Sequence, residues 1–349
     1  MIIETTQLET KRAETTELHA KQAQATSSQP KSMIAAVITA PGEVRIEEVP
    51  LPKPGYQEVL VALEGCGVCA SNLPVWEGRE WFNYPLPPGN PGHEGWGRIV
   101  AVGSGAAAFK VGDRVAFLSQ NAYASHDLAS INSLVKLPPA LNGQPVPAEP
   151  LACAFNVFAR SQIAPGSRVA VIGIGFLGAL LTHLAKQAGA EVIAISRRPF
   201  ALEMAQKFGA AHLIPMQDHW EIIDQVMTIT KGKGCECVIE AVGQQWPLDL
   251  AGELTAVRGR LIVAGYHQDG PRQVNMQLWN WRGLDVINAH ERDPAIYLSG
   301  MKSAIRALAH DQLDPTPLYT HTLPLDRLDQ AFALLQERPH GFFKALVTP

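Results

Sequence analysis

The sequence lacks both a long uninterrupted apolar run and a block of clustered basic residues. Its longest apolar stretch, residues 169–185, is interrupted by several glycines and by His183, so it fits a buried strand and helix better than a membrane span. The 29 Lys and Arg residues are nearly balanced by 33 Asp and Glu residues. We therefore expect neither a membrane anchor nor the basic surface that binds nucleic acid or anionic membranes.

Cysteine is scarce, and its number is odd. With no apolar signal segment, such a count argues against a disulfide framework and favours a reducing, cytoplasmic setting. The pair Cys66-x-x-Cys69 has no second pair to complete a zinc knuckle, so a redox or knuckle role is not favoured. Two further cysteines flank a predicted buried strand, where packing explains them. The five are Cys66, Cys69, Cys153, Cys235 and Cys237.

Residues 1–32 contain few large apolar side chains and are rich in Glu, Thr, Gln, Lys and Ala. Such a segment cannot bury enough surface to offset the entropy lost on ordering. We expect a flexible tail, with the folded protein beginning near Met33. Its glutamates and its missing apolar region argue against a signal or transit peptide.

Residues 33–155 show short alternating or apolar runs separated by Pro-Gly turns. This pattern is typical of a compact β-rich domain. The expected strands cover residues 34–39, 44–49, 58–65, 97–102 and 114–118.

From residue 156 to residue 290, strands alternate with helices. The strands are expected at 168–172, 191–195, 212–214, 236–240, 260–264 and 284–288. The alternation predicts an α/β domain with a parallel sheet covered on both faces. Because 349 residues exceed the size at which one core usually keeps growing, two domains are expected. Residues 291–349, with a helix at 295–310, are expected to return to the first domain.

The turn after residues 168–172 carries the pattern G-x-G-x-x-G, formed by Gly173, Gly175 and Gly178. Between a strand and a helix, this pattern holds the pyrophosphate of a dinucleotide against the helix N-terminus. Phe176 and Leu177 lie in the same turn. The alternative is an ordinary glycine-rich turn.

The end of the next strand bears on which dinucleotide is bound. A carboxylate there would bind the ribose hydroxyls of NAD, but this chain has Ser196, Arg197 and Arg198. Guanidinium groups match the oxygens of a 2′-phosphate. We predict NADP(H), the alternative being that both arginines only cap a solvated helix entrance.

Three candidate zinc ligands precede the dinucleotide fingerprint: Cys69, His93 and Cys153. A catalytic zinc takes three protein ligands from Cys, His and carboxylate and keeps one position open for water or substrate. The spacing alone does not identify a metal site.

The motifs around these residues jointly resemble the zinc-dependent branch of the medium-chain dehydrogenase/reductase family, from about Met33 to the C-terminus. The resemblance implies a GroES-like β-rich catalytic domain and a Rossmann domain with a doubly wound parallel sheet. The matching segments are Gly67-Val68-Cys69-Ala70-Ser71-Asn72, Gly92-His93-Glu94 with Gly97, Gly112-Asp113-Arg114-Val115, and the glycine fingerprint, in that order.

The resemblance also implies roles for single residues. Cys69, His93 and Cys153 match the ligands of the catalytic zinc. Glu94 matches a carboxylate that can approach the metal when water is displaced. Ser71 matches the hydroxyl that exchanges the substrate's proton.

Two more positions follow from the resemblance. Asn72 occupies the place of an Asp whose hydrogen bond orients the zinc-bound histidine, and an amide can still accept that bond. The loop of Ala264, Gly265 and Tyr266 is expected to pass near the nicotinamide.

The sequence departs from the family pattern at three places. Pro74 stands where a relay histidine often lies. No four-cysteine lobe follows Val115, so one zinc per subunit is predicted. Glu149 lies where some polyol-type relatives place a glutamate near the metal, so the third ligand stays open between Glu149 and Cys153.

We therefore expect a zinc-dependent oxidoreductase that transfers hydride between NADP(H) and a small alcohol, aldehyde or ketone. As in relatives, a homodimer or homotetramer is expected. Two alternatives stay open: a zinc-free quinone or enone reductase of the same superfamily, and a non-catalytic NADP(H)-binding protein.

Overall fold

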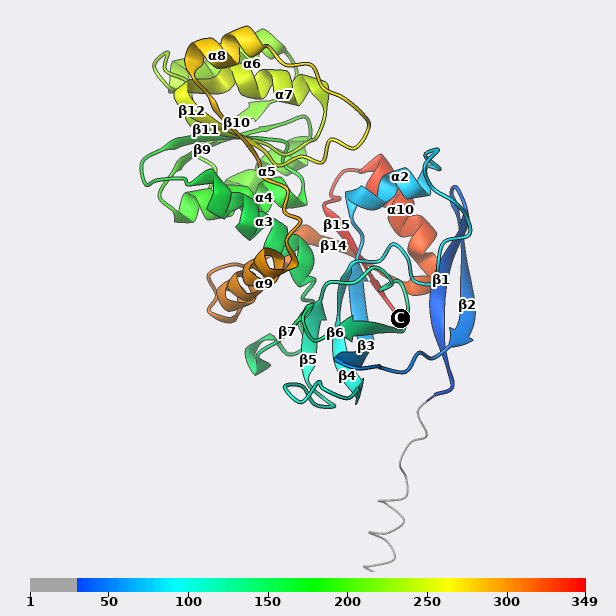
Figure 1. The fold of residues 1–349 in the computed structure, drawn as a ribbon. Coiled ribbons are helices and arrows are strands. Elements are labelled where there is room, and N and C mark those ends of the chain that lie inside the picture. The colour runs from blue at the N-terminus through cyan, green and yellow to red at the C-terminus, as the bar shows by residue number, and fades with distance from the viewer. Residues whose placement is uncertain (1–29) are drawn as a thin grey trace, which may run out of the picture.

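The computed structural model describes residues 30–349, which form two lobes (Figure 1). A tail was expected over residues 1–32. Residues 1–29 of this tail lie outside the described residues, and β1 begins at Ser32. Helices α3 (Ala148–Ser161) and α9 (Pro294–Ala309) lie against each other at the junction of the lobes.

One lobe, which contains residues 168–288, is built on a wholly parallel sheet with the strand order β10-β9-β8-β11-β12-β13. The order reverses between β8 and β11, so the carboxyl ends of these strands form the switch point at which such sheets bind ligands. The strands are β8 (Arg168–Ile172), β9 (Glu191–Ser196), β10 (His212–Pro215), β11 (Cys235–Glu240), β12 (Thr255–Val263) and β13 (Asp285–Asn288). The predicted Rossmann sheet is confirmed.

Helices cover both faces of this sheet because its strands are apolar on both sides. In β8, Val169 and Val171 join the core on the side of α4, whereas Ala170 and Ile172 join the core on the side of α6 and α7. The helices of this lobe are α4 (Phe176–Gln187), α5 (Pro199–Lys207), α6 (His219–Ile229), α7 (Gln245–Leu254) and α8 (Met276–Arg282).

The second lobe contains a mixed, mainly antiparallel sheet in the order β14-β15-β3-β4-β5-β7, with β6 also pairing with β3. The C-terminal strand β15 pairs with β3, which brings the end of the chain back to this lobe. The elements are β1 (Ser32–Ala40), β2 (Glu43–Pro50), β3 (Glu58–Gly67), α2 (Leu73–Trp76), β4 (Glu94–Val102), β5 (Arg114–Phe117), β6 (His126–Ser130), β7 (Leu134–Lys136), β14 (Tyr319–Pro324), α10 (Leu328–Glu337) and β15 (Lys344–Thr348).

Helix α3 was not expected from the sequence, and the boundary expected between residues 155 and 156 falls inside it. Pro147 and Pro150 surround its start, and prolines usually argue against a helix. Pro150 is tolerated because the first N–H groups of a helix have no partner within the helix.

Among residues 30–349, no helix combines the length and apolar character needed to cross a membrane.

The glycine-rich turn requires glycine at two positions, one for its backbone conformation and one for a close backbone contact. Gly173 has a φ of 94°, a left-handed conformation that favours glycine. A Cβ at Gly178 would lie 2.0 Å from the carbonyl oxygen of Gly173, whereas a Cβ at Gly175 would meet no atom within 4 Å. Gly178 is thus required by packing, while Gly175 borders open space.

We predict that Gly178→Ala lowers the free energy of unfolding by about 1–3 kcal/mol, because α4 must move away from the turn. Gly175→Ala serves as the matched control and should change stability little. Thermal unfolding of both variants measures the difference. Equal stability of the two variants would contradict the packing role of Gly178.

Candidate active site

The ends of two paired strands bring together three metal-binding side chains. Cys69 follows β3, and His93 and Glu94 stand at the start of β4, where Gly67 of β3 pairs with Glu94. The ligand atoms of Cys69, His93 and Glu94 lie within 4.8 Å of one another. The strand register thus assembles residues that are 25 positions apart in the chain.

The ring of His93 is oriented by a backbone carbonyl. Its Nδ1 lies 2.9 Å from the oxygen of Pro91, and because a carbonyl only accepts, Nδ1 carries the proton and Nε2 is left for a metal. The expectation that Asn72 orients His93 directly is wrong. The Asn72 amide donates to the Tyr123 hydroxyl (2.7 Å) and to the same Pro91 oxygen (3.4 Å), so it acts on the carbonyl that holds the ring.

Negative groups surround the His93 ring. Burial lowers the pKa of His93, but the hydrogen bond and charge of Cys69 and the charges of Glu149 and Glu94 outweigh burial and raise the pKa to about 10. Without a metal, the ring thus holds a second proton and is positively charged. A thiol, an imidazole and carboxylates are donors that zinc accepts, so these residues fit a zinc ion.

Glu94 forms a buried ion pair that the sequence analysis did not identify. Its carboxylate is fully buried, and Oε2 lies 2.7 Å from Nζ of Lys344, which is itself only 4% exposed. A Cβ at Gly67 would lie 1.8 Å from Oε2 of Glu94, so glycine there leaves space for the pair. The sequence feature that could have indicated this ion pair is a lysine within the apolar run of residues 342–347.

Cys153 lies outside the group of three. Its Sγ is 3.0 Å from the hydroxyl of Tyr297 and 3.5 Å from Oε1 of Glu149. Burial and then the charge of Glu149 raise the pKa of the Cys153 thiol, and the charge of Cys69 contributes to the rise. Both candidates for the third ligand therefore lie together on α3, one helical turn apart.

Ser71 is half-buried in the short helix Ala70–Asn72, directly after Cys69. Its Oγ lies 3.4 Å from Oδ1 of Asn72 and can donate to it. Pro74 lies in α2 and offers no group that carries a proton.

The glycine-rich turn adjoins the metal-binding group through Lys344. Gly175 caps α4 without a side-chain hydrogen bond to its first N–H groups, which leaves them for an anion. Phe176 and Leu177 open this helix, and Nζ of Lys344 lies 4.8 Å from the centre of the Phe176 ring. One lysine thus contacts both the donor carboxylate and the start of α4.

Ser196 ends β9, and Arg197 and Arg198 follow it. Arg198 donates to the carbonyls of Phe342 (2.6 Å) and Ile174 (3.1 Å), and so links the C-terminal segment to the glycine-rich turn. Ser196 Oγ accepts from the backbone N–H of Arg198.

A third arginine joins this pair. Burial and the charges of Arg338 and Arg197 lower the pKa of Arg198; burial and Arg197 lower the pKa of Arg338. Within residues 30–349, none of the three guanidinium groups has a carboxylate partner. Arg338, at the end of α10, had no motif to indicate it.

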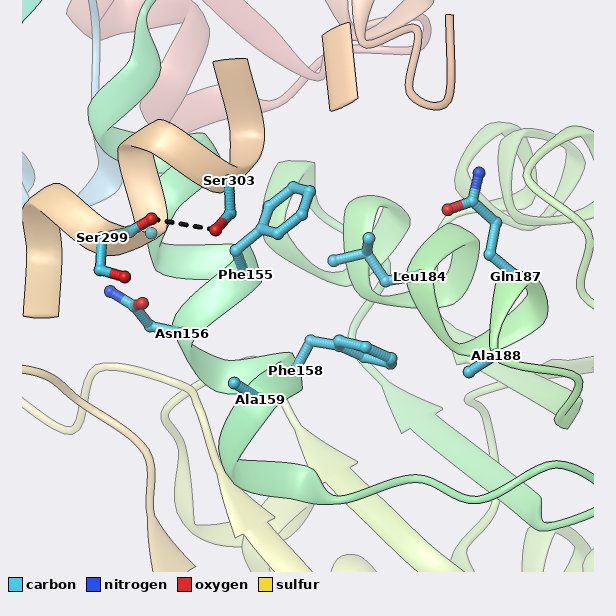
Figure 2. A pocket seen from close by; sticks show the side chains of 10 residues that line it. Phe155, Asn156, Phe158, Ala159, Leu184, Gln187, Ala188, Ser299 and Ser303 are labelled. Carbon is cyan, nitrogen blue, oxygen red and sulfur yellow. Dashed lines mark hydrogen bonds between the residues drawn. The ribbon is translucent and has the colours of Figure 1, made fainter. Parts of the chain in front are cut away.

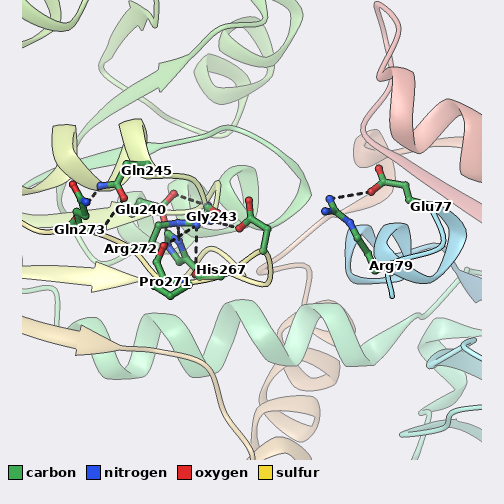
Figure 3. A network of polar contacts seen from close by, with 11 residues as sticks. Glu77, Arg79, Glu240, Gly243, Gln245, His267, Pro271, Arg272 and Gln273 are labelled. Atoms are coloured by element: carbon green, nitrogen blue, oxygen red, sulfur yellow. Dashed lines mark hydrogen bonds and ion pairs between the residues drawn. The ribbon is translucent and has the colours of Figure 1, made fainter. Parts of the chain in front are cut away.

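The loop after β12 is fixed by a polar network around Glu240 (Figure 3). The fully buried carboxylate accepts from the backbone N–H groups of Val242 (2.7 Å) and Gly243 (2.8 Å). Arg272 donates to Nδ1 of His267, whose Nε2 then donates to Glu240 at 3.0 Å. The sequence analysis missed this network, although an acidic residue ending an apolar strand was a signal.

The predicted loop residues Ala264, Gly265 and Tyr266 lie next to this network, and Glu240 holds their backbone. The N–H groups of Ala264 and Gly265 each donate to the Glu240 carbonyl at 2.8 Å. Tyr266 is 55% exposed and stacks on His290, with ring centres 5.8 Å apart. The loop thus presents an aromatic pair at the carboxyl ends of β12 and β13.

Comparison with known proteins places both lobes in one family. The model of the alcohol dehydrogenase GroES-like domain matches residues 55–134, and the model of the zinc-binding dehydrogenase matches residues 177–299. The sorbitol dehydrogenase of Bacillus subtilis is 27% identical over 354 residues, covering 92% of this chain and 98% of the relative. The L-threonine 3-dehydrogenase of Pyrococcus horikoshii is 26% identical over 345 residues, covering 89% and 97%.

A solved structure shows the same fold. The 2R,3R-butanediol dehydrogenase from Bacillus subtilis matches with a TM-score of 0.80 and 24% identity, covering 91% of this chain and 100% of the other. The two family models and the sequence relatives, with the donor group at the end of β3 and the start of β4, show that the chain belongs to the zinc-type medium-chain alcohol dehydrogenase family of oxidoreductases.

Proposed function

We propose that this protein transfers hydride between NADP(H) and an alcohol or carbonyl substrate, with one zinc ion as Lewis acid. The observation that carries the proposal is the donor group of Cys69, His93 and Glu94, which Lys344 connects to the start of α4. A zinc-free reductase has no need of such a donor group.

Cys69, His93 and Cys153 would hold the zinc, and Glu94 would approach it when water is displaced. A bound zinc would stabilise negative charge on the substrate oxygen. The Pro91 carbonyl holds His93 in the tautomer that leaves the lone pair of Nε2 free to bind a metal.

Ser71 exchanges the substrate's proton at Oγ, and the carbonyl of the Asn72 side chain accepts from that hydroxyl. Because Pro74 carries no proton, the onward path from Ser71 runs through water, the coenzyme ribose or another group.

The coenzyme would lie over the glycine-rich turn, with its pyrophosphate at the open space beside Gly175. Bound there, NADP(H) supplies or accepts the hydride. Arg197, Arg198 and Arg338 form a cationic cluster without carboxylate partners, which suits the added 2′-phosphate. Tyr266 lies on the loop proposed to face the nicotinamide.

The relatives suggest a class of substrate. Sorbitol, L-threonine and 2R,3R-butanediol each carry a hydroxyl beside a second polar or hydroxylated carbon. We propose a small polar secondary alcohol, or the matching ketone, and these three compounds form the first assay panel.

Cys69→Ser is expected to lose zinc and activity on this panel while coenzyme binding changes little. Metal analysis, turnover and a coenzyme titration measure the three effects. Cys66→Ser is the matched control, because that buried thiol donates to the Gly67 carbonyl and lies outside the donor group.

Full activity of Cys69→Ser would contradict a metal mechanism. Purified wild-type protein without stoichiometric zinc would favour the quinone or enone reductase. Coenzyme binding without turnover on any alcohol or carbonyl would favour the non-catalytic alternative.

The wild-type protein is expected to bind NADPH more tightly than NADH in a fluorescence titration. Charge-assisted hydrogen bonds are worth about 1.5–3 kcal/mol, so Arg197→Ala or Arg338→Ala should weaken NADPH binding by about 10- to 100-fold and leave NADH binding similar. Arg306→Ala, on α9, is the control. Tighter binding of NADH by the wild type would refute the NADP(H) assignment.

We also propose a homodimer formed through the edge strand β13. Exposed apolar side chains lie on the neighbouring elements: Val257 of β12 is 70% exposed, and Met276 and Trp281 of α8 are 61% and 87% exposed. Such side chains are expected to be covered by a partner.

Trp281→Glu should shift the protein toward the monomer in sedimentation velocity, because it places a charge in the proposed interface. Trp220→Glu is the control, since Trp220 is 69% exposed on α6, which packs beside the opposite edge strand β10. A Trp281→Glu protein with the wild-type sedimentation coefficient would exclude this face.

A further inference from the structure

A groove of about 480 Å³ lies between α3, α4 and α9 (Figure 2). Its lining side chains are apolar groups, amides and hydroxyls, such as Phe155, Asn156 and Ser299. Phosphate groups are bound by cations and by helix N-termini, so this groove does not suit the coenzyme. The glycine-rich turn instead has the polar network of Glu240 beside it.

This network joins two segments at the carboxyl ends of the neighbouring strands β11 and β12 (Figure 3). The Glu240 carboxylate accepts from two backbone N–H groups of the turn after β11 (residues 241–243) and from Nε2 of His267 in the loop after β12. Arg272 donates to Nδ1 of His267 and also to the Gly243 carbonyl, both at 2.9 Å. Three side chains thus fasten the turn after β11 to the loop after β12.

The backbones of this turn and this loop are also in direct contact. Gly243 has a φ of 85°, and a Cβ there would lie 2.5 Å from the carbonyl oxygen of Tyr266. A Cβ at Gly265 would lie 2.2 Å from the backbone nitrogen of Gly243. Because no space is left between them, the turn and the loop hold each other in place.

The turn after β11 also contacts the glycine-rich turn. A Cβ at Gly173 would lie 2.4 Å from Cγ2 of Val242, and the N–H of Ala241 donates to the carbonyl of Ile172 at 2.9 Å. In a doubly wound sheet the coenzyme lies over the carboxyl ends of the strands. The network therefore connects the proposed pyrophosphate site to Tyr266, on the loop proposed to face the nicotinamide.

His267 links two opposite charges in this network. Because Arg272 donates to Nδ1, the ring carries its proton on Nε2 and donates it to Glu240. The side chain of His267 is only 15% exposed, and that of Glu240 is fully buried. A buried carboxylate that loses a hydrogen-bond partner is destabilised, so this bond fixes the position of the loop.

We propose that His267 and Arg272 are positioning residues for the nicotinamide half of the coenzyme, acting through the loop that carries Tyr266. The inference rests on the coenzyme site of the proposed function. The adenosine half is assigned to the glycine-rich turn and to the arginines after β9. Loss of His267 or Arg272 should therefore affect the nicotinamide half alone.

The test compares NADPH with 2′-phospho-ADP-ribose, which lacks the nicotinamide ring, by isothermal titration calorimetry of the full-length protein. His267→Leu is expected to weaken NADPH binding by about 10-fold, the effect of one hydrogen bond to a charged group, and to leave binding of the fragment unchanged. A general loss of structure would weaken both ligands, so the difference between them reports on positioning.

Two further variants at histidines complete the comparison. His267→Gln should restore most of the NADPH affinity, because an amide can accept from Arg272 and donate to Glu240. His212→Leu is the matched control. Nε2 of His212 lies 2.8 Å from a carboxylate oxygen of Glu191, and this pair stands at the amino ends of β10 and β9, opposite the coenzyme side of the sheet. It should bind both ligands as the wild type does.

Arg272→Met removes the bonds to His267 and to the Gly243 carbonyl and should act in the same direction. It keeps the test valid if His267→Leu folds poorly. Equal losses for NADPH and the fragment, or no loss for either, would overturn the positioning role and leave the proposed function standing.

The wild type separates the two levels of the hypothesis. If it binds NADH more tightly than NADPH, the NADP(H) assignment falls, and the same comparison between NADH and ADP-ribose decides the role of His267 and Arg272. If it binds neither coenzyme, the proposed function falls and the positioning role falls with it.

Discussion

The buried ion pair of Glu94 and Lys344 connects the parts of this molecule on which its chemistry depends. Glu94 belongs to the donor group at the start of β4, while Lys344 begins β15 and lies over Phe176 at the start of α4. A carboxylate with no exposure to water needs a cation beside it, and removing one partner of such a pair costs about 3–5 kcal/mol. The return of the chain through β15 is therefore an electrostatic requirement of the metal-binding group as well as part of the sheet.

Glycines set the distances around this pair. At Gly67 a side chain would displace the Glu94 carboxylate, at Gly178 it would push α4 from its strand, and at Gly300 it would displace the Asn156 side chain of α3. Each glycine lets a backbone approach a functional group closely. The site is thus positioned by close contacts between rigid elements and not by its loops alone.

Charge is divided between the two proposed binding regions. Around His93, the Cys69 thiol and the carboxylates of Glu149 and Glu94 outweigh burial and raise the pKa of the ring to about 10. The end of β9 gathers Arg197, Arg198 and Arg338, where burial and then the charges of neighbouring arginines lower the pKa values of Arg198 and Arg338. One region suits a cation and the other an anion, which is the arrangement that a metal-dependent enzyme with a phosphorylated coenzyme needs.

The sequence by itself determined the Rossmann sheet, the glycine-rich turn and the positions of Cys69 and His93, because periodicity and local motifs depend on neighbours in the chain. Helix α3 was missed, since prolines at its start hide a helix whose first N–H groups need no partner. Only the tertiary structure decided that Pro91, and not Asn72, holds His93, and that Lys344, Tyr297 and Arg338 reach the candidate site. These contacts depend on strand register and on the distance between helices, which are set by packing between segments far apart in the sequence.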